Sequence, residues 1–250
     1  MQQTAYTLID KNSLGSLQND IDIYPEGIVI PIDKPYGWTS ADAVRKIKFS
    51  CQRYFHKKNI KVGHAGTLDP LATGILLICI GKATKQAEKL QSERKEYIAQ
   101  IKFGATTPSY DLEKEIDFTF PYERIDTESI SQVLPQFMGE IEQVPPIFSA
   151  KLINGTRAYE YARAGEEVQM RSSRITIYNL EIISFESPTL LIKIECSKGT
   201  YIRSFARDIG LALNSGAHLT NLIRTSSGEF RINRAVSIEE LNAKITAEQQ

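Results

Sequence analysis

The hydrophobic positions of the chain follow two periods, and these predict where strands and helices lie. Alternating or unbroken apolar runs predict strands at 27–33, 75–80, 97–103, 175–186 and 189–196. Spacings of three and four, with helix start signals, predict helices at 39–54, 82–90, 127–138, 199–213 and 237–245. The short polar break at Ser187 and Pro188 predicts an antiparallel hairpin between the last two strands.

The helix at 39–54 has a clear start signal. Thr39 followed three residues later by Asp42 is typical of a capping box, in which side chains satisfy the first free backbone N–H groups. We expect its inner stripe to consist of Val44, Ile47 and residues 48–51.

Residues 63–74 form a segment in which glycine and proline recur within a few positions. Four such residues predict a sharply bent turn of small residues before the apolar strand 75–80. A single carboxylate, Asp69, lies at the bend, and His64 is expected at the tip of the loop. From spacing alone, Asp69 is either a turn former before Pro70 or a reactive group on a loop held by a rigid strand.

The length and composition predict one domain with an insertion, because 250 residues with 42% hydrophobic content can bury a sizeable core. No apolar run approaches the roughly 20 residues that span a bilayer, and the N-terminus lacks the basic and apolar regions of a signal peptide. We therefore expect a cytoplasmic protein with no membrane partner. Cys51, Cys79 and Cys196 are far apart, which favours reduced thiols over disulfides or a zinc site.

The formal net charge of zero conceals a strong polarisation along the chain. Residues 45–103 hold thirteen Lys or Arg against four Asp or Glu, whereas residues 104–148 hold two against nine. Residues 193–234 are basic again, with seven against three. Each block alone is either a solvated face or a binding surface, and two basic blocks that carry the motifs below favour an RNA-facing surface.

Five segments carry the strongest functional signal. They are GIVIPIDKPYGWTS at 27–40, GHAGTLDPLATGILLICIGKATK at 63–85, KEYIA at 95–99, PPIFSAKLINGTRAYEYARAG at 145–165 and CSKGTYIRSFARDIG at 196–210. In this order they closely resemble the motifs of the TruB family of tRNA pseudouridine synthases, over roughly residues 27–240. The pair Lys151-Leu152 stands where many members have Leu-Lys.

The resemblance implies the pseudouridine synthase fold, an α/β fold of the α+β type. Its mixed, mostly antiparallel sheet is flanked by helices and has a central RNA-binding cleft. The catalytic domain is expected at 27–245, with an RNA-gripping insertion at about 145–174 and an N-terminal extension at 1–26 without an assigned function. Many relatives carry a C-terminal PUA-type domain. About ten residues beyond Leu241 are too few to form one, so we expect none.

The resemblance also assigns roles to single residues. Asp69 is the catalytic residue, and Tyr97 stacks on the target base, although without the resemblance a tyrosine at this position is more often a strand aromatic than a site residue. Arg203 in the Tyr-Ile-Arg motif lies beside Asp69 as its charge partner, although alone it is equally a surface arginine. Tyr201 shapes the pocket. His64 occupies the space that the flipped base vacates, and a metal is not expected, because the three histidines of the chain show no ligand spacing.

The basic residues of the insertion are candidates for RNA contact. Arg157 and Arg163 are interleaved with aromatic residues, a mixture suited to stacking on bases while holding phosphates. Lys61 leads into the central loop and is a further candidate. Lys34 is left outside the catalytic set, as either a structural residue or one that contacts the backbone.

The implied reaction is the isomerisation of uridine to pseudouridine at position 55 in the T-loop of tRNA. The base leaves the ribose through nitrogen, rotates and rejoins through carbon, so no cofactor is needed. Flipping the uridine out costs roughly a few kcal/mol, and stacking on an aromatic ring returns about 1–3 kcal/mol. Whether Asp69 attacks C1′ or removes the C2′ proton stays open.

The expected partner is the T stem-loop of tRNA, bound by a monomer without a protein partner. The alternatives are a non-catalytic tRNA-folding or RNA-binding protein and a synthase that acts on other RNA uridines. The set of Asp69, Tyr97 and Arg203 favours the enzyme.

Overall fold

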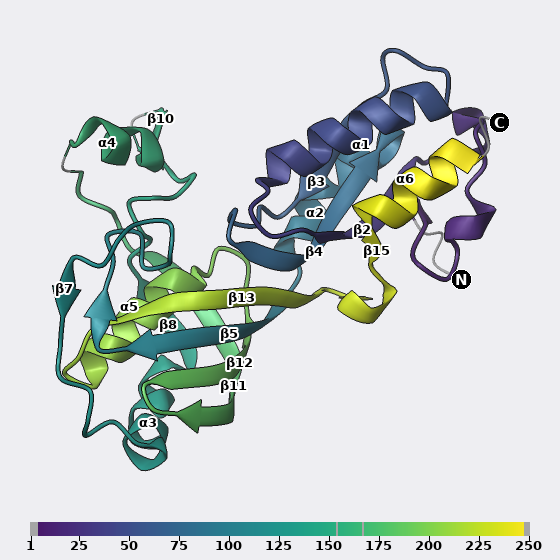
Figure 1. Ribbon diagram of the computed structural model, residues 1–250. Helices are drawn as coiled ribbons and strands as arrows, with labels where there is room; N and C mark the ends of the chain where they lie inside the picture. The colour runs from purple at the N-terminus through teal and green to yellow at the C-terminus, as the bar shows by residue number, and fades with distance from the viewer. Residues whose placement is uncertain (1–4, 154, 167, 248–250) are drawn as a thin grey trace. The chain divides into compact units, whose positions relative to one another are not determined.

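The computed structural model describes residues 5–153, 155–166 and 168–247 (Figure 1). The chain forms two compact units. Unit 1 comprises Met1–Lys95 and Ile223–Gln250, and unit 2 comprises Glu96–Leu222. The unit boundaries fall inside two strands, β5 (Lys95–Phe103) and β13 (Ala217–Ser227).

Unit 1 is built on two long antiparallel strands. Its strands are β1 (Thr7–Leu8), β2 (Ile28–Lys34), β3 (Val62–Ala65), β4 (Ala72–Ile80), β14 (Phe230–Arg231) and β15 (Val236–Ser237). Its helices are α1 (Ser40–Tyr54), α2 (Ala87–Ser92) and α6 (Ile238–Ala247), with short 3₁₀ helices η1 (Leu14–Ser16), η2 (Ile21–Ile23), η3 (Gly81–Gln86) and η5 (Ile232–Arg234). β2 pairs with β4 from Ile28 opposite Ile80 to Lys34 opposite Gly74. β1 and β15 extend β2 in parallel, and β3 pairs antiparallel with β4.

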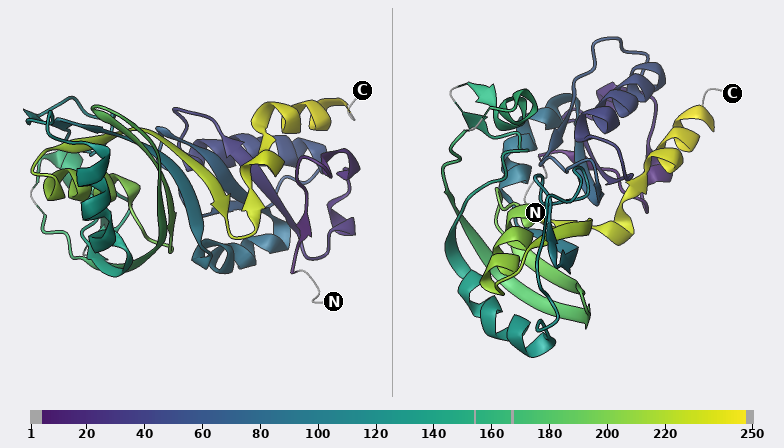
Figure 2. Two further views of the ribbon diagram at one scale, coloured as in Figure 1. Left: turned by 90° about the horizontal axis from the view of Figure 1, so that it is seen from below. Right: turned by 60° about the vertical axis from the view of Figure 1, so that its left-hand side comes forward.

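The apolar runs of β2 and β4 are unbroken because both faces of this sheet are covered. α1 and α6 lie side by side on one face (Figures 1 and 2) and share a core cluster with Ile30 of β2 and Ile78 of β4. The alternate residues Val29 and Leu77 belong to a second cluster on the other face, with Leu90 of α2. Each fully buried aliphatic side chain contributes about 1.5–3 kcal/mol. The strands predicted at 27–33 and 75–80 are therefore confirmed as core strands.

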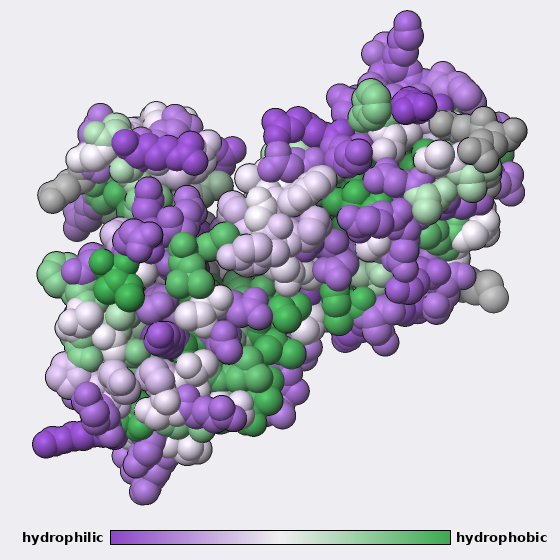
Figure 3. Space-filling model, in the orientation of Figure 1, coloured by the Kyte–Doolittle hydropathy of each residue, from purple (hydrophilic) through white to green (hydrophobic). Residues whose placement is uncertain are grey.

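α1 begins as its sequence predicts. The Thr39 side chain accepts from the Asp42 N–H at 3.0 Å, and the Asp42 carboxylate accepts from the Thr39 N–H at 2.9 Å, so the capping box is complete. The predicted inner stripe was partly wrong, because Lys48 and Phe49 are exposed and Ala43 is buried. Figure 3 shows the outer surface of α1 as mainly hydrophilic.

Unit 2 is a twisted antiparallel sheet with helices packed against it. Beside β5 and β13 it contains β6 (Ala105–Thr106), β7 (Phe118–Thr119), β8 (Gly139–Gln143), β9 (Leu152–Ile153), β10 (Thr156–Arg157), β11 (Ser173–Glu186) and β12 (Thr189–Cys196). Its helices are α3 (Thr127–Val133), η4 (Leu134–Phe137), α4 (Ala158–Ala164) and α5 (Ile202–Ala212). The strand order is β13-β5-β12-β11-β8. β11 and β12 form the predicted hairpin, from Ile177 opposite Cys196 to Glu186 opposite Thr189.

α5 packs through a continuous buried stripe. Ile202, Phe205, Ala206 and Ile209 are at most 4% exposed, and the Phe205 ring meets the Phe137 ring edge-on at 5.3 Å. Leu213, which the sequence pattern placed in the same stripe, is only half-buried.

The segment 145–174 forms a small substructure of its own. A two-stranded ribbon of β9 and β10 leads into α4, which ends at Gly165 in the left-handed conformation that glycine adopts without strain. Figure 1 shows α4 and β10 standing away from the sheet of unit 2. Among the described residues no helix is long and apolar enough to cross a membrane.

Candidate active site

Asp69 lies in the short connection between β3 and β4 of unit 1. β3 ends at Ala65 and β4 begins at Ala72, where the Ala72 N–H donates to the Asp69 carbonyl at 3.1 Å. The turn is therefore shorter than predicted. Residues 63–65 are not loop, because they pair with β4 and extend the sheet. The Asp69 side chain is half-buried. Its carboxylate thus lies at a tight bend between two paired strands.

Lys34 fixes the position of this bend from inside the unit. Its side chain is fully buried, and Nζ donates to the carbonyls of Pro35 at 2.9 Å, Trp38 at 2.7 Å and Pro70 at 3.2 Å. The Pro70 carbonyl also accepts from the Gly37 N–H at 2.9 Å. One ammonium thus joins the end of β2, the start of α1 and the residue after Asp69.

Arg224 of β13 holds the other side of the loop. It is 1% exposed, and its guanidinium donates to the carbonyls of Gly66 at 2.9 Å, Thr67 at 3.3 Å and Ile75 at 2.7 Å. Ser40 completes the support, because its hydroxyl accepts from the Leu68 N–H at 2.9 Å and donates to the Leu68 carbonyl at 3.0 Å.

Gly74 is required by the close approach of β13 to β4. Its φ is +97°, and a Cβ at this position would collide with the backbone of Arg224. A side chain here would push β13 away and displace the guanidinium that holds the loop. The glycine of this motif therefore serves packing rather than the turn itself.

Burial and neighbouring charges perturb the groups around Asp69. Burial lowers the pKa of Lys34 to about 8, against the attraction of the Asp69 carboxylate, and the positive charge of Arg224 lowers it further. Burial also raises the pKa of Asp33, whose carboxylate accepts from the Gly74 N–H at 3.1 Å. Two buried cations, Lys34 and Arg224, therefore support the loop that carries Asp69.

His64 lies within β3, opposite Ile78, rather than at the tip of a loop as predicted. It is half-buried, and burial followed by the charge of Arg224 lowers its pKa, which favours the neutral ring at pH 7. Its Nδ1 is buried and has no hydrogen-bond partner within the described part of the chain.

Tyr201 and Arg203 lie at the start of α5 in unit 2. Tyr201 precedes the helix, and its backbone N–H and carbonyl are held by the side-chain amide of Gln143 at 2.8 and 3.1 Å. The Arg203 side chain is 4% exposed and donates to the Phe148 carbonyl at 2.9 Å and the Ser109 carbonyl at 3.3 Å, with the Asp111 carboxylate at 3.7 Å. Arg203 thus ties the base of the insertion to the turn before Asp111 and is not a surface arginine.

The remaining predicted residues occupy three separate places. Tyr97 is half-buried near the start of β5. Arg157 and Arg163 are exposed on the insertion, where the Arg163 guanidinium lies 5.2 Å from the centre of the Tyr159 ring. Lys61 is exposed just before β3, and its carbonyl accepts from the Gly81 N–H at 2.8 Å.

The structure therefore places His64 on β3 and Asp69 in the connection that follows it in unit 1, and Tyr201 and Arg203 at the start of α5 in unit 2. Sequence reasoning missed Arg224 and the loop-holding role of Ser40, and it left Lys34 undecided. The sequence does carry a signal for Lys34 and Arg224, because each is a cation within an otherwise apolar strand pattern. Burying a cation without partners is costly, so such a position indicates that partners are present. The described residues contain no group of three or more His, Cys, Asp or Glu that could hold a metal ion.

Family models and similar proteins both relate this chain to tRNA pseudouridine synthases. Residues 52–202 match the model of the TruB family pseudouridylate synthase N-terminal domain, and residues 203–250 match that of the tRNA pseudouridylate synthase B C-terminal domain. The tRNA pseudouridine synthase B of Phocaeicola vulgatus is 53% identical over 86% of this chain and 92% of its own length. That of Flavobacterium johnsoniae is 52% identical over 86% of this chain and 94% of its own.

Solved structures show the same fold. A chain in the crystal structure of a Cbf5-Nop10-Gar1 complex superposes with a TM-score of 0.65 at 31% identity, over 86% of this chain and 53% of that one. A chain in the archaeal box H/ACA sRNP Nop10-Cbf5 complex gives a TM-score of 0.64 at 27% identity. This chain spans about half the length of these structural relatives.

The mixed sheet and the matched family model identify the chain as a pseudouridine synthase, an enzyme that isomerises uridine within RNA. The fold class predicted from the sequence is confirmed. More narrowly, the chain belongs to the TruB family of tRNA pseudouridine synthases.

Proposed function

We propose that this enzyme converts uridine 55 in the T-loop of tRNA to pseudouridine, with Asp69 as the catalytic carboxylate. The observation that carries the proposal is the support of the Asp69 loop by Lys34, Ser40 and Arg224, three side chains at most 3% exposed. Buried polar groups of this kind are costly unless they hold something in place. Here they hold the backbone on both sides of one half-buried carboxylate.

The reaction rearranges bonds without net redox change. The bond between N1 and C1′ breaks, the base rotates, and a bond between C5 and C1′ forms, while C5 loses a proton and N1 gains one. Asp69 either attacks C1′ directly or removes the C2′ proton to begin this sequence. In both routes the Asp69 carboxylate must be ionised.

The other predicted residues have roles that fit their surroundings. A neutral, half-buried His64 suits the space from which the target base is flipped. Tyr97 would stack on the flipped base, and Tyr201 would shape the pocket. Arg203, fixed at the start of α5, would serve as the charge partner of the Asp69 carboxylate.

The T stem-loop would be gripped by the insertion. Arg157 and Arg163 are exposed there, and the Arg163–Tyr159 pair presents a cation beside an aromatic face. Lys61 would contact the RNA from unit 1. The relatives named tRNA pseudouridine synthase B support tRNA as the substrate. A cytoplasmic monomer without a protein partner is part of the same proposal.

The test is to map pseudouridine in total tRNA from cells that lack this protein. We expect loss of pseudouridine at position 55 alone, restored by the wild-type gene and not by Asp69→Asn. Loss at another uridine would replace the proposed target. An unchanged map, or full restoration by Asp69→Asn, would contradict the proposed function.

A further inference from the structure

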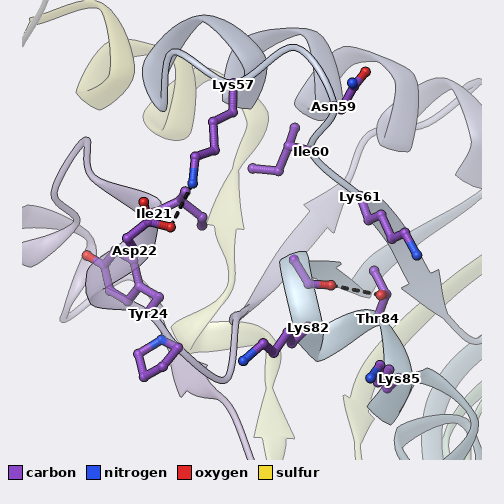
Figure 4. A pocket seen from close by; sticks show the side chains of 12 residues that line it. Ile21, Asp22, Tyr24, Lys57, Asn59, Ile60, Lys61, Lys82, Thr84 and Lys85 are labelled. Atoms are coloured by element: carbon purple, nitrogen blue, oxygen red, sulfur yellow. Dashed lines mark hydrogen bonds and ion pairs between the residues drawn. The ribbon is translucent and has the colours of Figure 1, made fainter.

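A pocket in unit 1 lies apart from the Asp69 loop and is lined by lysines. It has a volume of about 560 Å³ and is formed by three segments: residues 21–25 around η2, residues 57–61 after α1, and residues 81–85 of η3. Its inner wall includes Ile60 and Tyr24, which are 6% and 9% exposed. Figure 4 shows these residues and the lysines around them. We call it the lysine pocket.

The charge of the lysine pocket is strongly positive. Lys57, Lys61, Lys82 and Lys85 line it, against a single acid, Asp22. Asp22 is already paired with Lys57 at 2.6 Å. For the other three lysines, no carboxylate of the described residues lies within the 4.0 Å of an ion pair. Four cations and one anion leave a net charge of +3 around a concave surface.

The backbone beneath the lysines is fixed. The Gly81 N–H donates to the Lys61 carbonyl at 2.8 Å, and the Thr84 hydroxyl donates to the Gly81 carbonyl at 2.8 Å. Gly27, with φ of +78°, has no Cβ, and one would collide with the backbone of Ala83. These contacts hold η3 against the start of β2, so the backbone that carries Lys61, Lys82 and Lys85 is fixed.

The position of the pocket excludes the target nucleotide as its occupant. The Asp69 loop precedes Ala72 at one end of β4, and the pocket begins at Gly81, just after Ile80 at the other end. Eight residues of strand rise about 27 Å. Only a partner that extends well beyond the reacting uridine could occupy both places.

The chemistry of the lining favours phosphate over a base or a peptide. Lysine presents a compact point charge that attracts phosphates without the planar fork that reads guanine or carboxylate. Tyr24, the one aromatic residue of the lining, is buried, and its hydroxyl accepts from the Gln18 N–H at 2.9 Å, so no ring face is offered for stacking. Such a site contacts the phosphates of a nucleic-acid backbone and does not discriminate between base sequences.

We propose that the lysine pocket binds backbone phosphates of the substrate RNA at a distance from the T-loop. The inference rests on the proposed function, because it takes tRNA as the substrate. Phosphates of the RNA and those of a free polyphosphate share the same chemistry. An RNA held at the Asp69 loop can extend to the pocket about 27 Å away along β4, and this separation favours the RNA.

The test compares two double variants with the wild-type protein. Lys82→Gln with Lys85→Gln removes two charges from the pocket, and Lys46→Gln with Lys102→Gln removes two exposed charges outside it. Affinity for full-length tRNA is measured from 0.05 to 0.3 M salt. Each lost phosphate contact lowers the salt slope by about 0.7–0.9, so the pocket variant should lose about 1.4–1.8 in slope. With equal affinities at 1 M salt, this corresponds to roughly 25- to 60-fold weaker binding at 0.1 M salt.

Each outcome decides between the alternatives. Weaker binding and a lower slope for the pocket variant alone, with its melting temperature unchanged, support the proposal. Equal effects in both variants would show a general charge effect and overturn it. Inorganic triphosphate bound by the wild type and lost in the pocket variant, with tRNA affinity unchanged, would assign the site to a free polyphosphate instead. A wild-type enzyme that forms no pseudouridine in tRNA would contradict the proposed function. Normal turnover by the wild type, together with equal tRNA affinities of the wild type and the pocket variant, would contradict only the proposed role of the pocket.

Discussion

Lys34 offers a test of the support beneath the catalytic loop. The change Lys34→Met keeps the length of an apolar stem and removes the ammonium that donates to Pro35, Trp38 and Pro70. The carbonyl of Pro70 then loses one of its two donors, and the residue before it is Asp69. A misplacement of about 1 Å can cost on the order of 100-fold in rate. We expect turnover to fall by about 10- to 100-fold.

The stability effect of this change is worked from two opposing contributions. A pKa of about 8 in place of 10.5 disfavours the charged Lys34 by about 3 kcal/mol in the folded state, and removing it relieves that cost. The Pro70 carbonyl keeps its bond from the Gly37 N–H, so the change leaves the carbonyls of Pro35 and Trp38 without this donor, at a cost of roughly 1–3 kcal/mol each. The two contributions nearly cancel at pH 7, so we expect activity to change far more than the free energy of unfolding.

The pH dependence of the same pair of proteins gives a second readout. The pKa of Lys34 is lower in the folded chain than in the unfolded chain, so between pH 8 and 10.5 the unfolded chain keeps a proton that the folded chain has lost. The stability of the wild type therefore rises with pH through this window, relative to Lys34→Met. The gain should be about 2 kcal/mol between pH 7 and pH 9.5.

The assay is urea unfolding at both pH values with single-turnover pseudouridine formation at pH 7. Lys46→Met, an exposed change on α1, serves as the control and should alter neither quantity. Turnover of Lys34→Met within about twofold of the wild type, or a stability difference that does not vary with pH, would refute this reasoning.

Two further changes test other parts of the site. Arg224→Lys keeps the positive charge, but an ammonium lacks the planar fork that donates to the carbonyls of Gly66 and Thr67. We therefore expect a loss of about 2–3 kcal/mol in the free energy of unfolding and slower turnover. Unchanged urea unfolding would contradict this expectation. Arg157→Ala together with Arg163→Ala should weaken tRNA binding and lower its salt slope by about 1.4–1.8, and an unchanged slope would remove both residues from the RNA interface.

Much of the fold could be predicted because its signals are local. The capping box at Thr39 and Asp42 gave the start of α1, and alternating residues gave the β11–β12 hairpin. Errors arose where tertiary context overrides the pattern. His64 was assigned to a loop because glycine surrounds it, yet pairing with β4 makes it part of a strand. Phe49 was assigned to the core, yet α1 turns it outward, 59% exposed.

The candidate site was predicted only in part, for the same physical reason. Asp69 could be found from its motif, because the residues that mark it are neighbours in sequence. Arg224 could not, because it holds the loop through Gly66, which is 158 residues away. Lys34 likewise reaches the Pro70 carbonyl, and its partners follow from the pairing of β2 with β4 rather than from spacing.

The central claim is that the Asp69 carboxylate carries out the chemistry. Asp69→Asn keeps the shape of the side chain and its ability to form a turn, while removing the charge. The backbone contacts that hold the loop come from Lys34, Ser40 and Arg224, so folding should be preserved.

The most direct measurement pairs tRNA affinity with single-turnover pseudouridine formation for wild type and Asp69→Asn. We predict turnover lower by a factor of about 1,000 or more, which is more than about 4 kcal/mol in activation free energy. Affinity should be equal or slightly higher, because phosphate contacts persist and a negative charge near RNA is lost. Near-normal turnover in a folded Asp69→Asn protein that binds tRNA would contradict the account.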